Sequence, residues 1–229
     1  MSRNSFIARL LRFLGILLMV LTGGFTLLGG IGTACVAFKP KGFGPSMAKI
    51  APFQWLYILF VLAGITLGVL GIRAAIQLIK GHPGSYKNAL GILIAGTLVG
   101  LLHIVSSRLL RGQSMPADAI VYVTVFTLVV FLIFKIPSIW QGVDFTKAPR
   151  KDNLKAGGAA AILLGVLALT IQFLMAPTHT WDGVNYANAF YASMTVSGIA
   201  LLLLGIGLLA RVRLPEVSTR QLDASKTQI

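Results

Sequence analysis

FLGILLMVLTGGFTLLGGIGTACVAF, residues 13–38, is an apolar stretch without a single charged side chain. The hydrocarbon core of a bilayer is about 30 Å thick, and a helix needs about 20 apolar residues to cross it. Residues 13–38 are therefore long enough to span a membrane. Further charge-free runs occupy residues 51–72, 88–107, 119–134, 156–181 and 183–210.

The composition of the whole chain of 229 residues agrees with this interpretation. Hydrophobic residues make up 56% of the chain and charged residues 11%, and the mean hydropathy is +0.84. Soluble domains carry about 25% charged residues, and disordered chains combine low hydrophobicity with high charge. Both classes are excluded, which leaves an all-α polytopic membrane protein.

The apolar runs and the Pro and Gly residues beside them predict six transmembrane helices in three hairpins. The helices are expected at residues 8–37, 52–79, 86–111, 116–137, 154–175 and 187–213. The fourth is extended beyond its short apolar run because Lys135 can snorkel to the interface. The hairpins show no alignable repeat, and no loop is long enough for a soluble domain. The chain is thus predicted to be a single bundle, residues 1–229, with a short basic tail at residues 214–229.

The net charge of +14 comes from 20 Lys and Arg residues that lie at the ends of the apolar runs. A nucleic-acid-binding surface would gather them in a stripe or a tail, so no nucleic-acid partner is expected. Cytoplasmic loops of membrane proteins retain Lys and Arg. Fifteen of the 20 fall on the side of the two termini, and the other five are Lys39, Lys41, Lys49, Arg108 and Arg111. We therefore expect a multi-pass protein of the plasma or cytoplasmic membrane with both termini in the cytoplasm.

The first apolar run has a second interpretation. A basic start, an apolar run and Gly32-Thr33-Ala34-Cys35 loosely resemble a lipoprotein processing site. The run is longer than the 7–15 residues of a signal-peptide core, and Gly32 replaces the leucine-like residue that such sites prefer. A retained helix is therefore expected. Cys35 is the only cysteine, which excludes an internal disulfide.

No catalytic residue, metal or cofactor is expected. The chain has one glutamate, neither a Walker A nor a dinucleotide fingerprint, and no acidic residue within an apolar run. Gly44-Pro45-Ser46-Met47 superficially resembles a serine nucleophile turn, but no general base is assigned beside it. We interpret it as a loop. A non-catalytic protein is therefore favoured, and a membrane enzyme is the third hypothesis after the two given below.

Glycines form stripes on two predicted helices. The spacings of four, three and four place one set on a single face of the third helix: Gly96, Gly100, His103 and Ser107. The second helix carries a matching set: Gly64, Gly68 and Gly71. Small residues let helix backbones approach closely in lipid. The stripes therefore predict tight helix packing, and in the simplest interpretation His103 is hydrogen-bonded across that interface.

A functional interpretation starts from the depth of His103. It lies eight residues before Arg111, which places it about 12 Å inside the outer end of its helix. Together with polar residues on this and other helices it predicts an outward-facing pocket for a small ligand or a quinone head group, formed by His103, Ser107, Thr124, Gln172, Thr195 and Ser197. Haem is disfavoured because no second histidine lies opposite His103 in a helix. Arg108 and Asp118 are expected to pair across the short third loop.

Two functions follow from these features. The leading hypothesis is a non-catalytic accessory or scaffold subunit of a membrane complex, surrounded by the lipid bilayer and packed against partner subunits or its own copies. Its motivation is the number of glycine positions, five of them in the first helix alone: Gly23, Gly24, Gly29, Gly30 and Gly32. The alternative is a transporter or binding protein for a small solute or lipophilic ligand, with its pocket around His103.

Overall fold

The computed structural model describes residues 2–115, 117–147, 150–176, 180–181, 184–185, 188 and 191–213. Within these residues, six helices are long and apolar enough to cross a membrane, as the sequence predicts. They are α1 (Phe6–Phe38), α3 (Gln54–Lys80), α4 (Ser85–Arg111), α5 (Ala117–Phe134), α7 (Arg150–Met175) and α8 (Tyr191–Arg213). The short elements are η1 (Pro40–Phe43), α2 (Gly44–Ala48), η2 (Ala51–Phe53), α6 (Pro137–Val143), β1 (Thr180–Trp181) and β2 (Val184–Asn185).

Local chemistry sets the helix ends. α3 and α4 are followed by Gly81 and Gly112, whose φ angles of 66° and 77° are left-handed values that glycine adopts without steric cost. The predicted end of the fourth helix at residue 137 is wrong, because α5 ends at Phe134. Ile136 is extended, with a ψ of 123°, as expected for a residue before proline, and Pro137 begins the separate helix α6.

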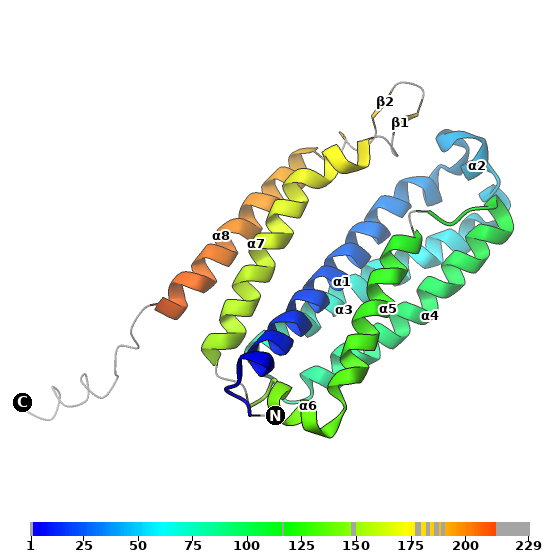
Figure 1. Cartoon of the computed structure of the whole chain (residues 1–229). Coiled ribbons are helices and arrows are strands. Elements are labelled where there is room, and N and C mark those ends of the chain that lie inside the picture. The colour runs from blue at the N-terminus through cyan, green and yellow to red at the C-terminus, as the bar shows by residue number, and fades with distance from the viewer. Residues whose placement is uncertain are drawn as a thin grey trace, which may run out of the picture.

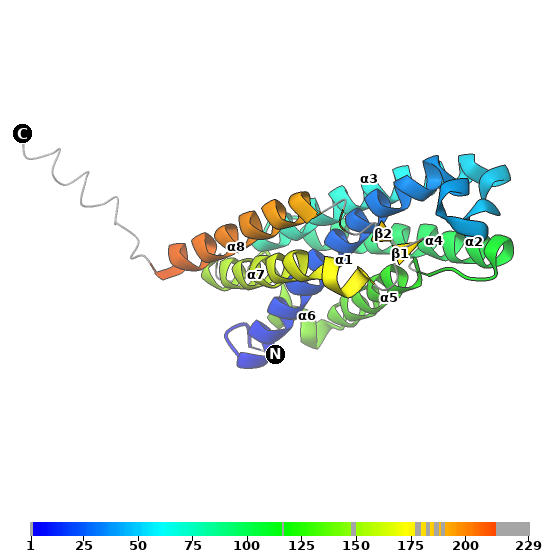
Figure 2. The same cartoon turned by 90° about the horizontal axis from the view of Figure 1, so that it is seen from above.

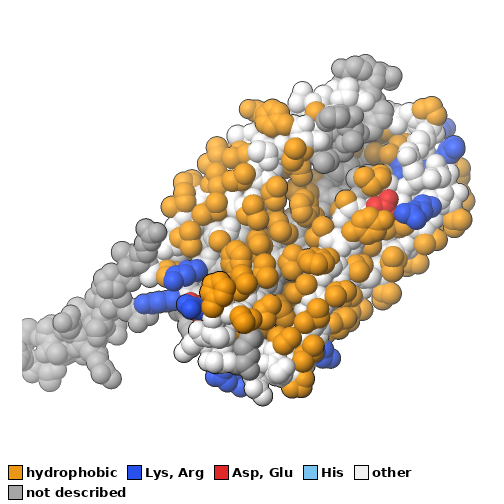
Figure 3. All heavy atoms as spheres, viewed as in Figure 1, with side chains coloured by type: hydrophobic (Ala, Val, Ile, Leu, Met, Phe, Trp, Pro, Cys, Tyr) orange, Lys and Arg blue, Asp and Glu red, His pale blue; other side chains and the backbone are white. Residues whose placement is uncertain are grey.

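The helices are arranged as a body of four and a flanking pair. α1, α3, α4 and α5 form the body, and α7 and α8 lie side by side along one flank of it (Figure 1, Figure 2). α3 packs on α1, α5 on α4, and α8 on α7, while α7 also contacts α1 and α3. We call the end of the body that carries α2 the α2 end and the opposite one the α6 end. Apolar side chains cover the flank, and Lys and Arg gather toward the ends (Figure 3).

Paired glycines bring α1 and α3 together backbone to backbone. A methyl group on Gly71 would lie 2.9 Å from the Cα of Gly23, and one on Gly64 would lie 3.3 Å from the Cα of Gly30. The two pairs are seven residues, or two turns, apart on each helix. A side chain at these positions would separate the helices, so the glycines permit the close approach.

The α7–α8 pair repeats this arrangement. Gly158 packs on Gly205 and Gly165 on Gly198, and a methyl group on any of the four would lie within 3.0 Å of its partner's carbonyl oxygen. The spacing on each helix is again seven residues. The pattern Gly-Ile-x-Leu-x-x-Leu-Gly-Ile begins at Gly64 in α3 and at Gly198 in α8. The first and last helix pairs therefore share one glycine packing register, although the sequence alone predicts no alignable repeat of the hairpins.

An aromatic core closes the body at the α6 end. The rings of Phe131, Phe134 and Phe145 lie with their centroids 5.5 to 6.5 Å apart, and each side chain is at most 1% exposed. Ile16 and Met19 of α1 are fully buried in the same cluster. Contacts of this kind between aromatic rings add to the packing of a core. The largest cluster of buried apolar side chains in the described residues thus includes this aromatic core.

Candidate functional site

A cleft of about 70 Å³ lies where α1, α3, α4 and α5 meet, toward the α2 end of the body. Its walls are mainly apolar side chains and glycines, and its polar members are Thr26, Thr33, His103 and Thr124. No Asp, Glu, Lys or Arg is among the lining residues in the described part of the chain. A water molecule needs about 10–15 Å³ of such space, so the cleft has room for a few waters or a small organic group.

His103 lies between two aromatic rings of α3. Its imidazole is stacked on Phe60, with ring centroids 4.5 Å apart, and meets Tyr57 edge to face at 5.5 Å. The expected hydrogen bond of His103 across the helix interface is not found: among the described residues its ring nitrogens have no hydrogen-bond partner. The ring is therefore fixed by aromatic packing, while its polar atoms remain available beside the cleft.

Three threonines contribute hydroxyl groups to the same cleft. Thr33 and Thr124 donate to carbonyl oxygens of their own helices, Gly29 and Ile120, at 2.7 and 2.8 Å. Their hydroxyl oxygens keep free lone pairs as acceptors. The Thr26 hydroxyl has no hydrogen-bond partner within the residues that the structure describes. Thr26 and His103 are thus the unpaired polar side chains of the cleft.

A pair of hydrogen-bonded threonine hydroxyl groups lies at the inner end of the cavities, which we call the floor. Below the cleft lies a second cavity of about 10 Å³, which shares Thr26 and Thr124 as lining residues. Thr22 also lines it and is hydrogen-bonded to Thr127 across the body at 2.8 Å. Thr22 is at the middle of α1, and the aromatic core begins beneath it. These two cavities therefore lie between the middle of the body and its α2 end.

The predicted pocket residues are only partly brought together. His103 and Thr124 both line the cleft. Ser107 does not, because it is 1% exposed and hydrogen-bonded to Tyr57 Oη at 2.9 Å. Thr195 and Ser197 lie on α8, which packs mainly on α7, and neither lines the cleft. The side chain of Gln172 falls outside the described residues.

Some of the predicted packing glycines line the cleft, and others lie at contacts between helices. Gly64, Gly96 and Gly100 line the cleft, and a methyl group on Gly100 would lie 2.5 Å from Val121 of α5. Gly71 faces Gly23, and Gly68 receives Leu27 of α1. The glycine faces on α3 and α4 are therefore used for contacts between helices of this chain.

A polar cluster ties the loops at the α2 end. Arg108 and Asp118 are 3.4 Å apart, which confirms the predicted pair, and Ser114 donates to the Asp118 carboxylate at 2.7 Å. Arg111, only 9% exposed, donates to the carbonyl oxygens of Gln113 and Met115. These two arginines hold the loop between α4 and α5, and neither of them lines the cleft.

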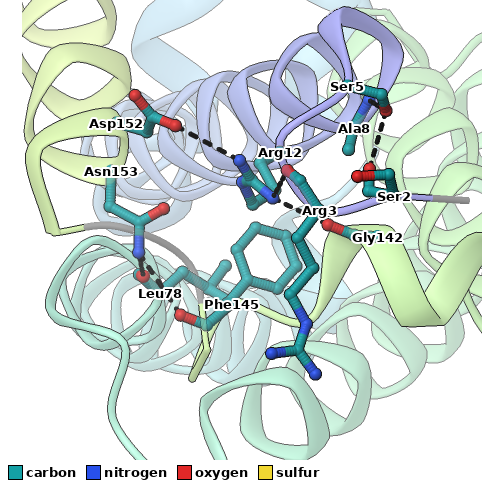
Figure 4. A network of polar contacts seen from close by, with 10 residues as sticks. All are labelled: Ser2, Arg3, Ser5, Ala8, Arg12, Leu78, Gly142, Phe145, Asp152 and Asn153. Carbon is teal, nitrogen blue, oxygen red and sulfur yellow. Dashed lines mark hydrogen bonds and ion pairs between the residues drawn. The ribbon is translucent and has the colours of Figure 1, made fainter.

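A second polar cluster, which sequence reasoning missed, lies at the α6 end (Figure 4). Arg12 is 2% exposed; it donates to the carbonyl oxygens of Arg3 and Gly142 and pairs with Asp152 at 3.3 Å. It thereby joins the chain before α1, the end of α6 and the first turn of α7. By sequence, Arg12 is one more basic residue flanking an apolar run, and only its neighbour in space distinguishes it.

Asn153 forms the second half of this cluster (Figure 4). Its amide nitrogen lies 3.4 Å from the carbonyl oxygen of Leu78 and 3.3 Å from that of Phe145. Asp152 and Asn153 therefore attach the start of α7 to α1, α3 and the segment after α6. This cluster fastens the flanking pair to the body.

No protein-family model, curated protein or solved structure matches this chain, so its function is inferred from the cleft and the helix contacts alone.

Proposed function

We propose that this chain is a non-catalytic multi-pass membrane protein that binds a small molecule in the cleft beside His103. The observation that carries the proposal is that Thr26 and His103, two polar side chains of a mainly apolar cleft, have no hydrogen-bond partner among the described residues. Polar groups away from water carry a free-energy cost unless they are hydrogen-bonded. Ligand pockets have this composition, apolar walls with a few convergent polar groups.

The size of the cleft limits its occupant. Pockets for drug-sized ligands have volumes of about 300–1,000 Å³, several times the roughly 70 Å³ here. The occupant is therefore a small molecule or the inserted head of a longer lipophile. A large substrate does not fit.

The distribution of Lys and Arg supports an orientation for this site. Of the 18 Lys and Arg within the described residues, 13 lie toward the α6 end, and this asymmetry is typical of cytoplasmic loops. In the proposed orientation the α2 end faces outward. The cleft then occupies the outer half of the membrane, and the aromatic core closes its cytoplasmic side.

A filling substitution tests the binding proposal. Val99 lines the cleft, so Val99→Phe should occupy it, whereas Leu102→Phe on the same helix adds the same ring at a 62% exposed, lipid-facing position. The protein would be isolated from its native membrane in nanodiscs and its bound small molecules identified by mass spectrometry. We expect a molecule that the wild type and Leu102→Phe retain and Val99→Phe lacks. Identical extracts from all three proteins would contradict the proposal.

The accessory-subunit hypothesis remains a second candidate because of one feature of α8. In the repeated pattern, Ile199 and Ile206 of α8 correspond to Ile65 and Ile72 of α3. The α3 residues are half-buried, whereas the α8 residues are 48% and 57% exposed. Four of the five α1 glycines that motivated the hypothesis contact other helices of this chain, and Gly32 alone among them meets open space. The support therefore rests on α8.

Crosslinking distinguishes a protein neighbour from lipid on α8. In a Cys35→Ser background, Ile206→Cys would be treated with a bifunctional thiol reagent in the native membrane, with Leu62→Cys, also 57% exposed, as the matched position on α3. A larger adduct with Ile206→Cys alone supports a subunit interface. No adduct with either variant indicates lipid on both faces.

A further inference from the structure

We infer that the molecule bound beside His103 is uncharged and carries a hydroxyl-type head on an apolar body. This inference rests on the proposed function and concerns the chemistry of the same cleft. Its evidence is the set of hydrogen-bonding atoms that the cleft leaves free, the distribution of charge around it and the shape left by Phe60.

The unpaired polar atoms of the cleft match a ligand group that both donates and accepts hydrogen bonds. A neutral imidazole has one N–H donor and one nitrogen acceptor, and a threonine hydroxyl has one donor and two lone pairs. Neither His103 nor Thr26 has a hydrogen-bond partner among the described residues. Thr33 and Thr124 offer acceptor lone pairs only, since their protons are given to their own helices. A hydroxyl group matches this set because it donates one hydrogen bond and accepts others.

Among the described residues, the wall of the cleft offers no charged side chain that an ionic ligand could contact. The carboxylate nearest in sequence to the cleft wall, Asp118, accepts from Ser114 and pairs with Arg108. Arg111 is directed to loop carbonyl oxygens at the α2 end. An ion placed in the cleft would lose its hydration without a counter-charge in contact with it, which disfavours its binding. An uncharged ligand avoids this cost.

The shape of the cleft places the head at the edge of the imidazole. One face of the His103 ring is covered by Phe60 at 4.5 Å. Apolar side chains of α4 and α5, including Val99, Ile120 and Val121, line the remaining wall. The head would therefore meet the ring nitrogens, and the body would pack on these aliphatic side chains.

Three probes of similar size test the inference: phenol, toluene and benzoate. The intact protein, with its histidines labelled by ¹⁵N, would be titrated in nanodiscs, and the His103 resonances would be assigned as those that His103→Phe lacks. We expect saturable shifts with phenol, at least about threefold weaker binding of toluene, and no saturable effect of benzoate. Thr26→Val should weaken the binding of phenol about three- to tenfold and leave the binding of toluene unchanged. Thr66 is exposed on α3, so Thr66→Val should change the binding of neither probe.

The outcomes separate the two proposals. Equal affinity for phenol and toluene, or preference for benzoate, overturns the uncharged hydroxyl head and leaves binding in the cleft intact. If no probe gives a saturable shift, the inferred hydroxyl head is contradicted. If wild type and Val99→Phe retain the same small molecules from the native membrane, the proposed binding function is contradicted. A phenol with an eight-carbon chain tests whether the ligand comes from the membrane or from solution. If it binds more strongly than phenol, the ligand is a hydroxylated membrane lipophile. If it does not bind, the ligand is a small hydroxylated solute.

Discussion

Gly71 of α3 lies directly against Gly23 of α1, so closely that a methyl group on Gly71 would be 2.9 Å from the Gly23 Cα. Gly205 of α8 has the corresponding relation to Gly158 of α7. Helices in lipid associate through close packing, because lipid tails are as apolar as the helices themselves. These contacts therefore determine how near each helix pair can approach, and α1 and α3 form two walls of the cleft.

Leucine at either repeated glycine should loosen its helix pair. We expect Gly71→Leu and Gly205→Leu each to lower the free energy of unfolding by about 1–3 kcal/mol, because the backbone opposite cannot move aside without separating the helices. Gly207→Leu is the control, since a methyl group there meets nothing within 4 Å. Thermal unfolding in a mild detergent measures the three variants. An equal loss with Gly207→Leu would argue against the packing explanation.

Removing the buried guanidinium at the α6 end should release the attachment of α7. Arg12→Met leaves the Asp152 carboxylate without its ion pair and two carbonyl oxygens without their donor. We expect a loss of about 1–3 kcal/mol in stability, measured by the same thermal unfolding. Arg9→Met changes an exposed arginine of the same helix and should have little effect. Similar values for both variants would show that the Arg12 contacts contribute little.

The proposed orientation predicts which side of the membrane Cys35 faces. Cys35 is exposed near the α2 end of α1, so a membrane-impermeant thiol reagent should label it in intact cells. A reporter fused after Ile229 should stay in the cytoplasm. Labelling in inside-out vesicles alone would reverse the orientation, and the cleft would then face the cytoplasm.

The six spans could be predicted because length and apolar character act along the chain. A charge-free run such as residues 13–38 indicates a helix without any knowledge of its neighbours. The end of α5 was misplaced because Lys135 was given more weight than the restriction that Pro137 imposes on the preceding residue. The shared packing register of the two helix pairs could not be predicted, because it depends on which glycines meet in space: Gly64 faces Gly30, and Gly198 faces Gly165.

The position of the cleft along the helices could be predicted from the sequence, but the set of residues that line it could not. Depth along a helix follows from residue counting, and two of the residues that it selects, His103 and Thr124, line the cleft. Which helix faces meet depends on packing, so the same counting also selected Thr195 and Ser197 on a helix that does not reach the cleft. Thr26 was missed because a lone threonine in an apolar helix carries no signal until its neighbours in space are known.

The most direct measurement of the central claim is the thiol reactivity of a cysteine at position 26. In a Cys35→Ser background, Thr26→Cys would be treated with a small neutral methanethiosulfonate, and Thr22→Cys, at the 5% exposed floor, would serve as the buried reference. If the cleft is open as described, Thr26→Cys reacts much faster than Thr22→Cys, and adding Val99→Phe suppresses the reaction. If Thr26→Cys is as unreactive as Thr22→Cys, or if Val99→Phe leaves its rate unchanged, position 26 does not line an accessible cleft and the binding function is contradicted.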